Sequence, residues 1–430
     1  MQRTHSTSKR PSLHRQAALA ALFCSILALP ASGATRSAEV GLLRALETAS
    51  LLVIGQIDEV TPLLHMGYAA HLSVERVLRP QSDASRLAGQ SIEFVWEETS
   101  PRIRPRLSAG QRVVVALEPG PTASIWKQRI PDPARRAALR SLAAGGQGYL
   151  QGASAGMLGA LEHYLALTQA ARRGEAGATY LSQLAATAPP RLALDAVLRL
   201  KHEPKLIEAL TPAAGEALIA AMLRSDADST ARMALQLVEE ERPAVLLPLL
   251  EARIGSLGAK APVPLLAARA ALQDGLPADL EEQLMESGSE EQRKTAVRWA
   301  TGPEAGERLR HAMLRDRSPA VREAALLRLA RLEGSTAASD LLQGFEDREP
   351  SVQYAAARAL ASFGPEVLPD LRRAIDRGSP QGSKAAVVAI TLMPGGEARH
   401  ALEELARDHE DPAVRALARI SLGQPLDEDH

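Results

Sequence analysis

Between residues 316 and 423, one arrangement of polar and apolar positions occurs four times. Each copy opens with an acidic or hydroxyl-bearing residue followed by a proline, and apolar residues then recur at spacings of three and four. This spacing places the apolar side chains on one face of a helix, and proline suits the first helical turn because that turn needs no amide from it. The prolines are 31, 30 and 32 residues apart, at Pro319, Pro350, Pro380 and Pro412.

A second amphipathic run lies between successive copies, for example over residues 337–344, 367–375 and 398–406. Two helices of about a dozen residues, with their turns, fill a period of this length, which is typical of stacked helical hairpins. The pattern therefore predicts an all-α solenoid of stacked helical hairpins in the second half of the chain.

The first copy reads Asp316-Arg-Ser-Pro-Ala-Val-Arg-Glu-Ala-Ala-Leu-Leu-Arg-Leu. It resembles the HEAT repeat, particularly the short bacterial form. The resemblance implies a stack in which the Asp and Arg of successive copies pair in a ladder. Asp316 and Arg322 keep both positions, whereas Gln353 and Lys384 replace the arginine in the next two copies. An interrupted ladder is therefore expected in the middle copies.

The same apolar phase continues toward the N-terminus in less regular copies, which start near residues 190, 229, 262 and 290. About eight repeats are predicted over residues 189–423. A short acidic tail follows at residues 424–430.

A pattern with period two runs from about residue 51 to residue 130. Runs of this kind, separated by Gly and Pro, predict β-strands. The five segments are Leu51–Val60, Tyr68–Leu78, Ser91–Trp96, Arg112–Leu117 and Ser124–Ile130. They predict a small all-β barrel or sandwich over residues 35–130, with a short helix over residues 39–50 leaning on one end.

The succession of a Gly-x-Ile strand, a strand ending in Val-Glu-Arg-Val-Leu78 and a strand reading Gly-Gln-Arg-Val-Val-Val-Ala-Leu117 resembles netrin- and tissue-inhibitor-like modules of the OB type. The resemblance implies a face that holds a peptide or a glycan, with Trp96 and the basic loop at residues 102–106 as its distinctive features. A solvated hairpin loop is the alternative interpretation of that loop. Residues 131–188 are predicted to form a helical linker and a cap for the solenoid.

Residues 1–34 have the pattern of a secretory signal peptide. A basic leader without acidic residues precedes an apolar run over residues 17–29 and then small residues. The apolar run is 13 residues long, which is short for a membrane span. The protein is therefore predicted to be exported, to the periplasm or the cell exterior, with no transmembrane segment after cleavage.

Cleavage would remove the only cysteine, Cys24, and would move the formal charge from −1 to about −5, with 46 Lys and Arg against 51 Asp and Glu. A mature chain of this kind has no disulfide or thiol chemistry. The mild acidity also argues against a nucleic-acid partner, whose footprint is basic.

The sequence does not contain the catalytic motifs for which we searched. No strand is predicted before the Gly-Ala-Ser-Ala-Gly run at residues 152–156, and the glycines at residues 145–148 have no Lys-Ser/Thr after them. The pairs His202-Glu203 and His409-Glu410 lie at predicted turns, where such pairs usually act as caps. No catalytic residue, cofactor or metal site is predicted.

The remaining prediction concerns the side chains that the solenoid exposes to a partner. In HEAT-like stacks the Val-Arg helices line the concave side, so outward cations there would attract an acidic peptide or anionic polymer. The predicted partner-binding residues are Arg298, Arg322, Arg328, Tyr354, Arg358, Lys384, Arg419, Trp96, Arg102 and Arg104. Arg322 could instead belong to the ladder.

The sequence thus favours an exported, non-enzymatic protein that binds a protein or peptide partner as a scaffold. The alternative is a lyase-like or enzyme accessory factor with a site where the β-domain meets the first repeats, since the short repeats also resemble those of HEAT-like lyases that attach bilin pigments.

Overall fold

The computed structural model describes residues 41–424, except for residue 65 and the ranges 98–106, 121–124, 144–147 and 226–227. The predicted signal peptide and the tail beyond residue 424 lie outside these residues, as do Arg102 and Arg104. Within the described part, no helix is both long and apolar enough to cross a membrane.

Residues 51–151 form a small β-barrel at the N-terminal end of the described chain. Strand order is β1-β2-β3-β5-β4, and β4 also pairs with β1, so five strands close on themselves. All pairings are antiparallel except that of β3 with β5, and β6 adds to the free side of β4. The strands are β1 (Leu51–Leu63), β2 (Gly67–Arg79), β3 (Ser91–Glu97), β4 (Arg112–Pro119), β5 (Arg140–Leu142) and β6 (Tyr149–Gln151). The prediction of a small β-domain followed by an α-solenoid is confirmed.

The central strands carry apolar residues on both faces of the sheet, because one face lines the barrel interior and the other is covered by further elements. In β1, Leu51 and Val53 belong to the barrel interior, while the alternate residues Leu52 and Ile54 join a second core that continues into the helices. This explains why the β1 sequence reads as an apolar run near its start and alternates only farther along.

Two parts of the secondary-structure prediction are wrong. The predicted strand Ser124–Ile130 is replaced by a helix in its described part: α4 (Ile125–Arg129) is a short helix whose Trp126 packs with Ile130 on Ala69 and Val95. An aromatic residue that packs on the outside of the barrel produces the same apolar run as a strand.

The start of the helical linker predicted from residue 131 is also not helical throughout. It forms α5 (Pro133–Ala138), which ends at Leu139, and then strand β5. The barrel therefore continues to Gln151 in β6, beyond the predicted limit at residue 130. Strands of three residues are too short to give a period-two signal.

Helix α2 (Leu42–Thr48) lies between the barrel and the solenoid. Its buried residues Leu42 and Leu46 belong to the same core as the first repeats. The N–H of Leu43 donates to Asp195 at 3.0 Å, and the Arg79 guanidinium donates to the carbonyls of Leu46 and Ala49 at the other end of the helix. Because both ends of α2 are satisfied by groups from other elements, the helix joins β2 to the first repeats.

Three helices follow the barrel, at α7 (Ala155–Ala166), α8 (Gln169–Arg172) and α9 (Glu175–Thr187). The buried Tyr164 of α7 donates a hydrogen bond of 2.6 Å to Glu47 of α2, and burial raises the pKa of this tyrosine. Only α7 and α8 precede the stack, because α9 already forms a hairpin with the first repeat helix.

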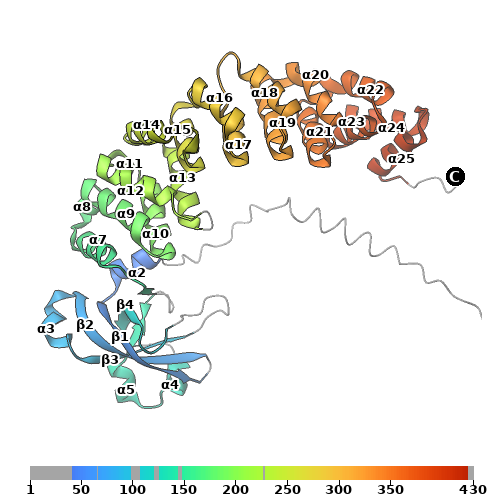
Figure 1. Cartoon of the computed structure of the whole chain (residues 1–430). Helices are drawn as coiled ribbons and strands as arrows, with labels where there is room; N and C mark the ends of the chain where they lie inside the picture. Colours follow the sequence, from blue (N-terminus) through green and yellow to red (C-terminus); the bar gives the residue numbers. More distant parts are fainter. Residues whose placement is uncertain are drawn as a thin grey trace, which may run out of the picture. The chain divides into compact units, whose positions relative to one another are not determined.

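The stack has two rows of helices (Figure 1). The first row comprises α10 (Pro190–His202), α13 (Ser229–Glu241), α15 (Val263–Gln273), α17 (Glu290–Trp299), α19 (Pro319–Glu333), α21 (Pro350–Ser362), α23 (Pro380–Leu392) and α25 (Pro412–Ser421). Each packs on its neighbours in this row. Four starts match the irregular copies predicted near residues 190, 229, 262 and 290.

The second row completes the hairpins and runs beside the first in Figure 1. It comprises α9, α12 (Pro212–Met222), α14 (Leu246–Leu257), α16 (Ala278–Ser287), α18 (Ala305–Arg315), α20 (Ala338–Leu341) with the 3₁₀ turn Leu342–Glu346, α22 (Leu368–Arg377) and α24 (Gly396–Asp408). The short α11 (Pro204–Glu208) lies between α10 and α12 in the chain.

An Arg–Asp ladder links three successive first-row copies. Arg293 makes two hydrogen bonds with Asp316, of 2.8 and 3.0 Å, and Arg322 makes two with Asp347, of 2.6 and 2.8 Å. Each arginine therefore reaches the aspartate that precedes the next helix. Paired, bidentate contacts of this kind are among the stronger side-chain interactions.

The ladder stops where the sequence predicts an interruption. Gln353 donates to the carbonyl of Asp347 in its own copy, and Arg415 donates to the carbonyls of His409 and Glu410. The start of the ladder differs from the prediction: the buried Arg293, in a copy without the full repeat phrase, is its first arginine.

The ladder aspartates also hold the entries of the next helices. Asp316 accepts from the N–H of Ser318, and Asp347 accepts from the N–H of Glu349. Burial would raise the pKa of Asp316, but these hydrogen bonds and the charge of Arg293 lower its pKa below the ordinary value. The same causes, with Arg322 as the cation, lower the pKa of Asp347.

Replacing Asp347 by Ala should lower the free energy of unfolding by about 3 kcal/mol, because it leaves the buried Arg322 without its partner. Urea unfolding followed by circular dichroism measures this. Arg348→Ala, at the neighbouring exposed position, is the control. A loss below about 1 kcal/mol for Asp347→Ala would show that the pair behaves as a surface ion pair.

Acid should weaken the stack through the same aspartates. Because their pKa values are lower in the folded state, the unfolded chain takes up protons first, so their stabilisation is present above about pH 4 and is lost as the pH falls below it. Urea midpoints measured from pH 7 to pH 3 test this. The double variant Asp316→Asn, Asp347→Asn should start lower and fall less steeply, and parallel curves would contradict the assignment.

Candidate functional site

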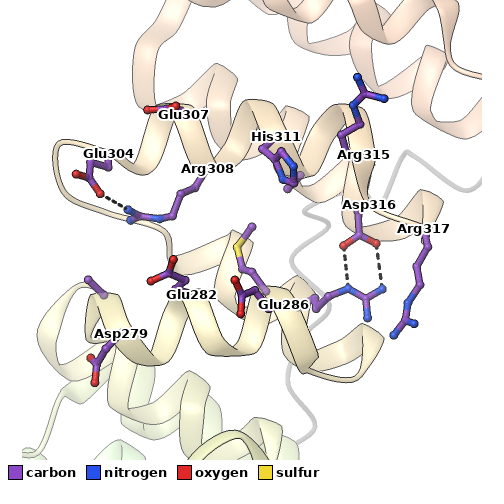
Figure 2. A pocket seen from close by; sticks show the side chains of 14 residues that line it. Asp279, Glu282, Glu286, Glu304, Glu307, Arg308, His311, Arg315, Asp316 and Arg317 are labelled. Carbon is purple, nitrogen blue, oxygen red and sulfur yellow. Dashed lines mark hydrogen bonds and ion pairs between the residues drawn. The ribbon is translucent and has the colours of Figure 1, made fainter.

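A cleft of about 960 Å³ opens between the second-row helices α16 and α18. Figure 2 shows that side chains from both helices point into it. Its lining residues are Ala278, Asp279, Glu282, Met285, Glu286, Arg293, Glu304, Glu307, Arg308, His311, Ala312, Arg315, Asp316 and Arg317. We call this space the α16–α18 cleft.

The cleft lies where the buried core of the stack divides. One hydrophobic core runs from α2 to Ala296, and a second runs from Val297 to α25, so the two meet within α17. Met285 packs on both cores from the cleft wall. The first row continues across the division through contact of α17 with α15 and α19, whereas α16 and α18 leave the cleft between them.

The α16 wall is a row of carboxylates. Asp279, Glu282 and Glu286 are spaced by three and four residues, which places them on one face of the helix. All three side chains are exposed, and none forms a hydrogen bond or ion pair with another described residue. Figure 2 shows them along one side of the cleft.

The α18 wall changes sign along its length. Glu307, His311 and Arg315 follow one another at intervals of four residues, so the wall runs from an acid through an imidazole to a cation. Arg317 extends the basic end beyond the helix, and Glu304 lies at the acidic end (Figure 2). The cleft therefore has an acidic end and a basic end.

A buried ion pair fixes the acidic end. Glu281 is 1% exposed and accepts from Arg308 at 2.9 Å. Arg308 also donates to the carbonyl of Thr301 at 3.1 Å and contacts Glu304 at 3.5 Å. Burial raises the pKa of Glu281, although the hydrogen bond from Arg308 acts in the opposite direction. Arg308 thus holds α16, the turn before α18 and α18 together.

The basic end contains the first step of the ladder. Arg293 and Asp316 line the cleft but are saturated by each other, at 2.8 and 3.0 Å. Their charges cancel locally, so the groups at this end that remain available to a ligand are Arg315 and Arg317, whose side chains are exposed.

The residues predicted from the sequence lie elsewhere, mainly on the first row. Arg298, Tyr354, Arg358 and Lys384 have exposed side chains on α17, α21 and α23, and Tyr354 is 47% exposed. The Arg298 guanidinium lies 5.9 Å from the ring centre of Trp299. Because α21 packs on both α19 and α23, Tyr354, Arg358 and Lys384 belong to adjacent first-row helices.

Two predicted residues do not offer an accessible side chain. Arg322 is buried in the ladder, and Trp96 is 3% exposed inside the barrel, where it stacks on Tyr68 with ring centres 5.4 Å apart. Arginine and tryptophan are residue types that binding surfaces often contain. Whether such a side chain is exposed depends on the orientation of its helix or strand, which the sequence pattern did not show.

Two further predicted cations are bound within the chain. Arg328 donates to the carbonyl of Ala300 at 3.2 and 2.8 Å, and Arg419 donates to the carbonyl of Ala406 at 3.4 Å. Both are half-buried. Arg328 therefore supports the turn between α17 and α18, and is not a free contact residue on the first row.

The sequence analysis did not identify the cleft as a site, although the acidic residues of α16 form a pattern that could have indicated it. Asp279, Glu282 and Glu286 share a helical face, but acidic residues on one face are ordinarily a solvated surface. Only the position of α18 shows that this face borders a cavity.

The His-Glu pairs form local contacts. His202 bonds the carbonyl of Leu198 at 2.6 Å, and Glu203 pairs with Arg199 at 2.7 Å. His409 accepts from the N–H of Asp411 at 3.1 Å. Within the described ranges, no group of three or more His, Cys, Asp or Glu side chains is placed to hold a metal ion.

The junction of the barrel and the helices, where the enzyme alternative places a site, contains a cavity of about 90 Å³. It is lined by Ile54, Arg112, Val113, Val114, Gly152, Ala153 and Leu158. This lining is apolar apart from Arg112.

Comparison with known protein families gives one match on the C-terminal part of the chain. Residues 338–423 match the family model of HEAT repeats. This region carries HEAT repeats. It covers the last three first-row helices, where the repeat pattern is clearest, and the ladder begins just before it. No curated protein matches the chain.

Two solved structures give similarities in arrangement. Human deoxyhypusine hydroxylase in complex with glycerol is 18% identical, with a TM-score of 0.23, over 58% of this chain and 96% of that chain. A designed armadillo repeat protein in complex with the peptide (KR)4 is 18% identical, with a TM-score of 0.17, over 57% of this chain and 98% of that chain.

Replacing Arg308 by Ala should lower the free energy of unfolding by about 3 kcal/mol, since Glu281 is then buried without a cation. The raised pKa of Glu281 also sets a pH dependence: its neutral form is the one that burial favours, so the contribution of Glu281 to stability should be largest at low pH and fall as the pH rises above about 4.3.

Urea unfolding of Arg308→Ala at pH 5 and pH 8 measures both effects. The double variant Glu281→Gln, Arg308→Ala should recover part of the loss and remove the added pH dependence. If Arg308→Ala is equally stable at the two pH values relative to the parent chain, Glu281 does not depend on this arginine.

Proposed function

We propose that this protein is an exported, non-enzymatic scaffold that binds a protein or peptide partner along the first row of its solenoid. The export step rests on the signal-peptide pattern of residues 1–34. Stacks of HEAT or armadillo type generally serve as binding surfaces, and the same architecture supports unrelated roles, so the site has to be argued from its residues.

The observation that carries the proposal is the set of exposed side chains on α21 and α23. Tyr354, Arg358 and Lys384 are exposed, and no hydrogen bond or ion pair to another described residue occupies Arg358 or Lys384. Arg298 adds an exposed cation on α17. A row of cations beside a tyrosine fits an acidic peptide, because guanidinium groups bind carboxylates in a bidentate manner and tyrosine supplies contact area.

The β-barrel is proposed as a second point of contact. The five strands close between β1 and β4, and a small barrel of this kind can present a binding face, as in the OB-type modules named above. The buried Trp96 does not serve this contact. The proposal keeps to a scaffold role, since the cavity that described residues line at the junction, of about 90 Å³, is below the usual size of ligand pockets.

The double variant Arg358→Glu, Lys384→Glu should bind an acidic peptide at least about fivefold more weakly, since each reversal replaces an attraction by a repulsion. A fluorescein-labelled peptide of eight glutamates, titrated with the full chain and followed by anisotropy, measures this. The parent affinity should also fall with added salt.

The matched control is Arg348→Glu, Arg377→Glu, which changes the net charge equally at exposed positions outside the first-row helices. Equal affinities of the parent chain and of Arg358→Glu, Lys384→Glu would reject the first row as the binding surface.

A further inference from the structure

We propose that the α16–α18 cleft is a second binding site, separate from the first-row surface, and that it takes a polypeptide segment with Lys or Arg side chains followed by acidic ones. The cleft is formed by second-row helices, whereas Arg358 and Lys384 lie on first-row helices. The two sites therefore differ in position, and their ligands differ in charge.

The acidic end selects the cations of the segment. Asp279 and Glu282 on α16, with Glu307 on α18, bring three exposed carboxylates to this end, and none has an ion-pair partner among the described residues. Glu286 continues the acidic α16 wall toward Asp316 (Figure 2). Like charges that share a cavity repel one another, and the repulsion is relieved when cations of a ligand enter.

The dimensions of the charged walls favour a polypeptide over a single ion. Asp279 and Glu286 are seven residues apart on one helix, which corresponds to about 10 Å. Carboxylates spread over that distance cannot coordinate one cation, in keeping with the lack of a metal-binding group in the described ranges. Successive side chains of an extended chain, at about 3.3 Å per residue, can reach them in turn.

The basic end gives the site a direction. Arg315 and Arg317 are exposed at the end of the cleft where Arg293 and Asp316 neutralise each other. A segment whose basic residues lie at the acidic end would therefore place the residues that follow beside Arg315. Acidic side chains suit that position, and further cations would be repelled.

The floor of the cleft contributes apolar contact. Met285 and Ala312 line it between the charged walls. Lys and Arg have aliphatic stems that pack on apolar surface while their charged ends reach a carboxylate. The cleft volume of about 960 Å³ is within the usual size of ligand pockets, so several side chains can enter together.

The test uses the full chain and the fluorescein-labelled peptide Lys-Arg-Lys-Ala-Asp-Glu, together with the peptide of reversed order, both followed by anisotropy. The double variant Glu282→Lys, Glu307→Lys should weaken binding about tenfold or more, because two attractions become repulsions. The control Glu366→Lys, Glu397→Lys changes the net charge equally at exposed positions away from the cleft. Circular dichroism checks that each variant is folded.

A second measurement examines the basic end. Replacing Arg315 by Glu should remove the preference for the peptide with Asp-Glu over one that carries Gln-Gln in the same places. This variant leaves the acidic wall intact. It therefore still tests the proposal if the double variant Glu282→Lys, Glu307→Lys does not fold.

The proposal is overturned if neither peptide binds the parent chain, or if both bind the parent and the cleft variant equally. Failure of the first-row proposal gives a different result: the peptide of eight glutamates would bind the parent chain and Arg358→Glu, Lys384→Glu equally, while Lys-Arg-Lys-Ala-Asp-Glu would still bind Glu282→Lys, Glu307→Lys more weakly than the parent chain.

Discussion

The structure depends on one constraint, which is that a helical hairpin of this sequence cannot bury its apolar face alone. Val321, Leu326 and Leu329 are completely buried, and they are covered only because the neighbouring hairpins lie against them. Alanines at first-row positions let these helices pack closely. The Arg–Asp ladder adds directional contacts to this packing, since each arginine meets the aspartate before the next helix. The stability of each hairpin therefore comes from the hairpins next to it. A break in the packing between two hairpins leaves an opening at the surface.

The α16–α18 cleft is the consequence of such a break. Within α17, Ala296 belongs to one core and Val297 to the other, so this helix is where the two cores meet. Polar contacts hold the elements around the cleft together, namely the buried pair of Glu281 with Arg308 and the ladder pair of Arg293 with Asp316. Among the described residues, no hydrogen bond or ion pair occupies Asp279, Glu282, Glu286, Glu307, Arg315 or Arg317, which is why these side chains of the cleft are best placed to meet a ligand.

The barrel is attached to the stack by shared packing and by helix ends. The apolar residues on the second face of β1 join the core of the first repeats, and Asp195 of α10 accepts from the N–H of Leu43. Burial raises the pKa of Asp195, although hydrogen bonding to the α2 backbone opposes this. The buried Tyr164–Glu47 contact and Arg79 act on the same helix. A β-domain and a solenoid are thus joined through α2, which is only seven residues long.

The sequence by itself determined the repeats, the solenoid, the small β-domain and the interrupted ladder, because each follows from local spacing of apolar residues, prolines and charges. It also indicated exposed cations on α21 and α23. It did not determine that residues 125–129 are helical or that β5 and β6 complete the barrel, since a packed aromatic residue and three-residue strands leave no distinct periodicity. The burial of Trp96, the ladder role of Arg293 and the cleft were decided only by tertiary structure. Each depends on contacts between helices or strands that are far apart in the sequence, and the local pattern of apolar and polar residues does not specify such contacts.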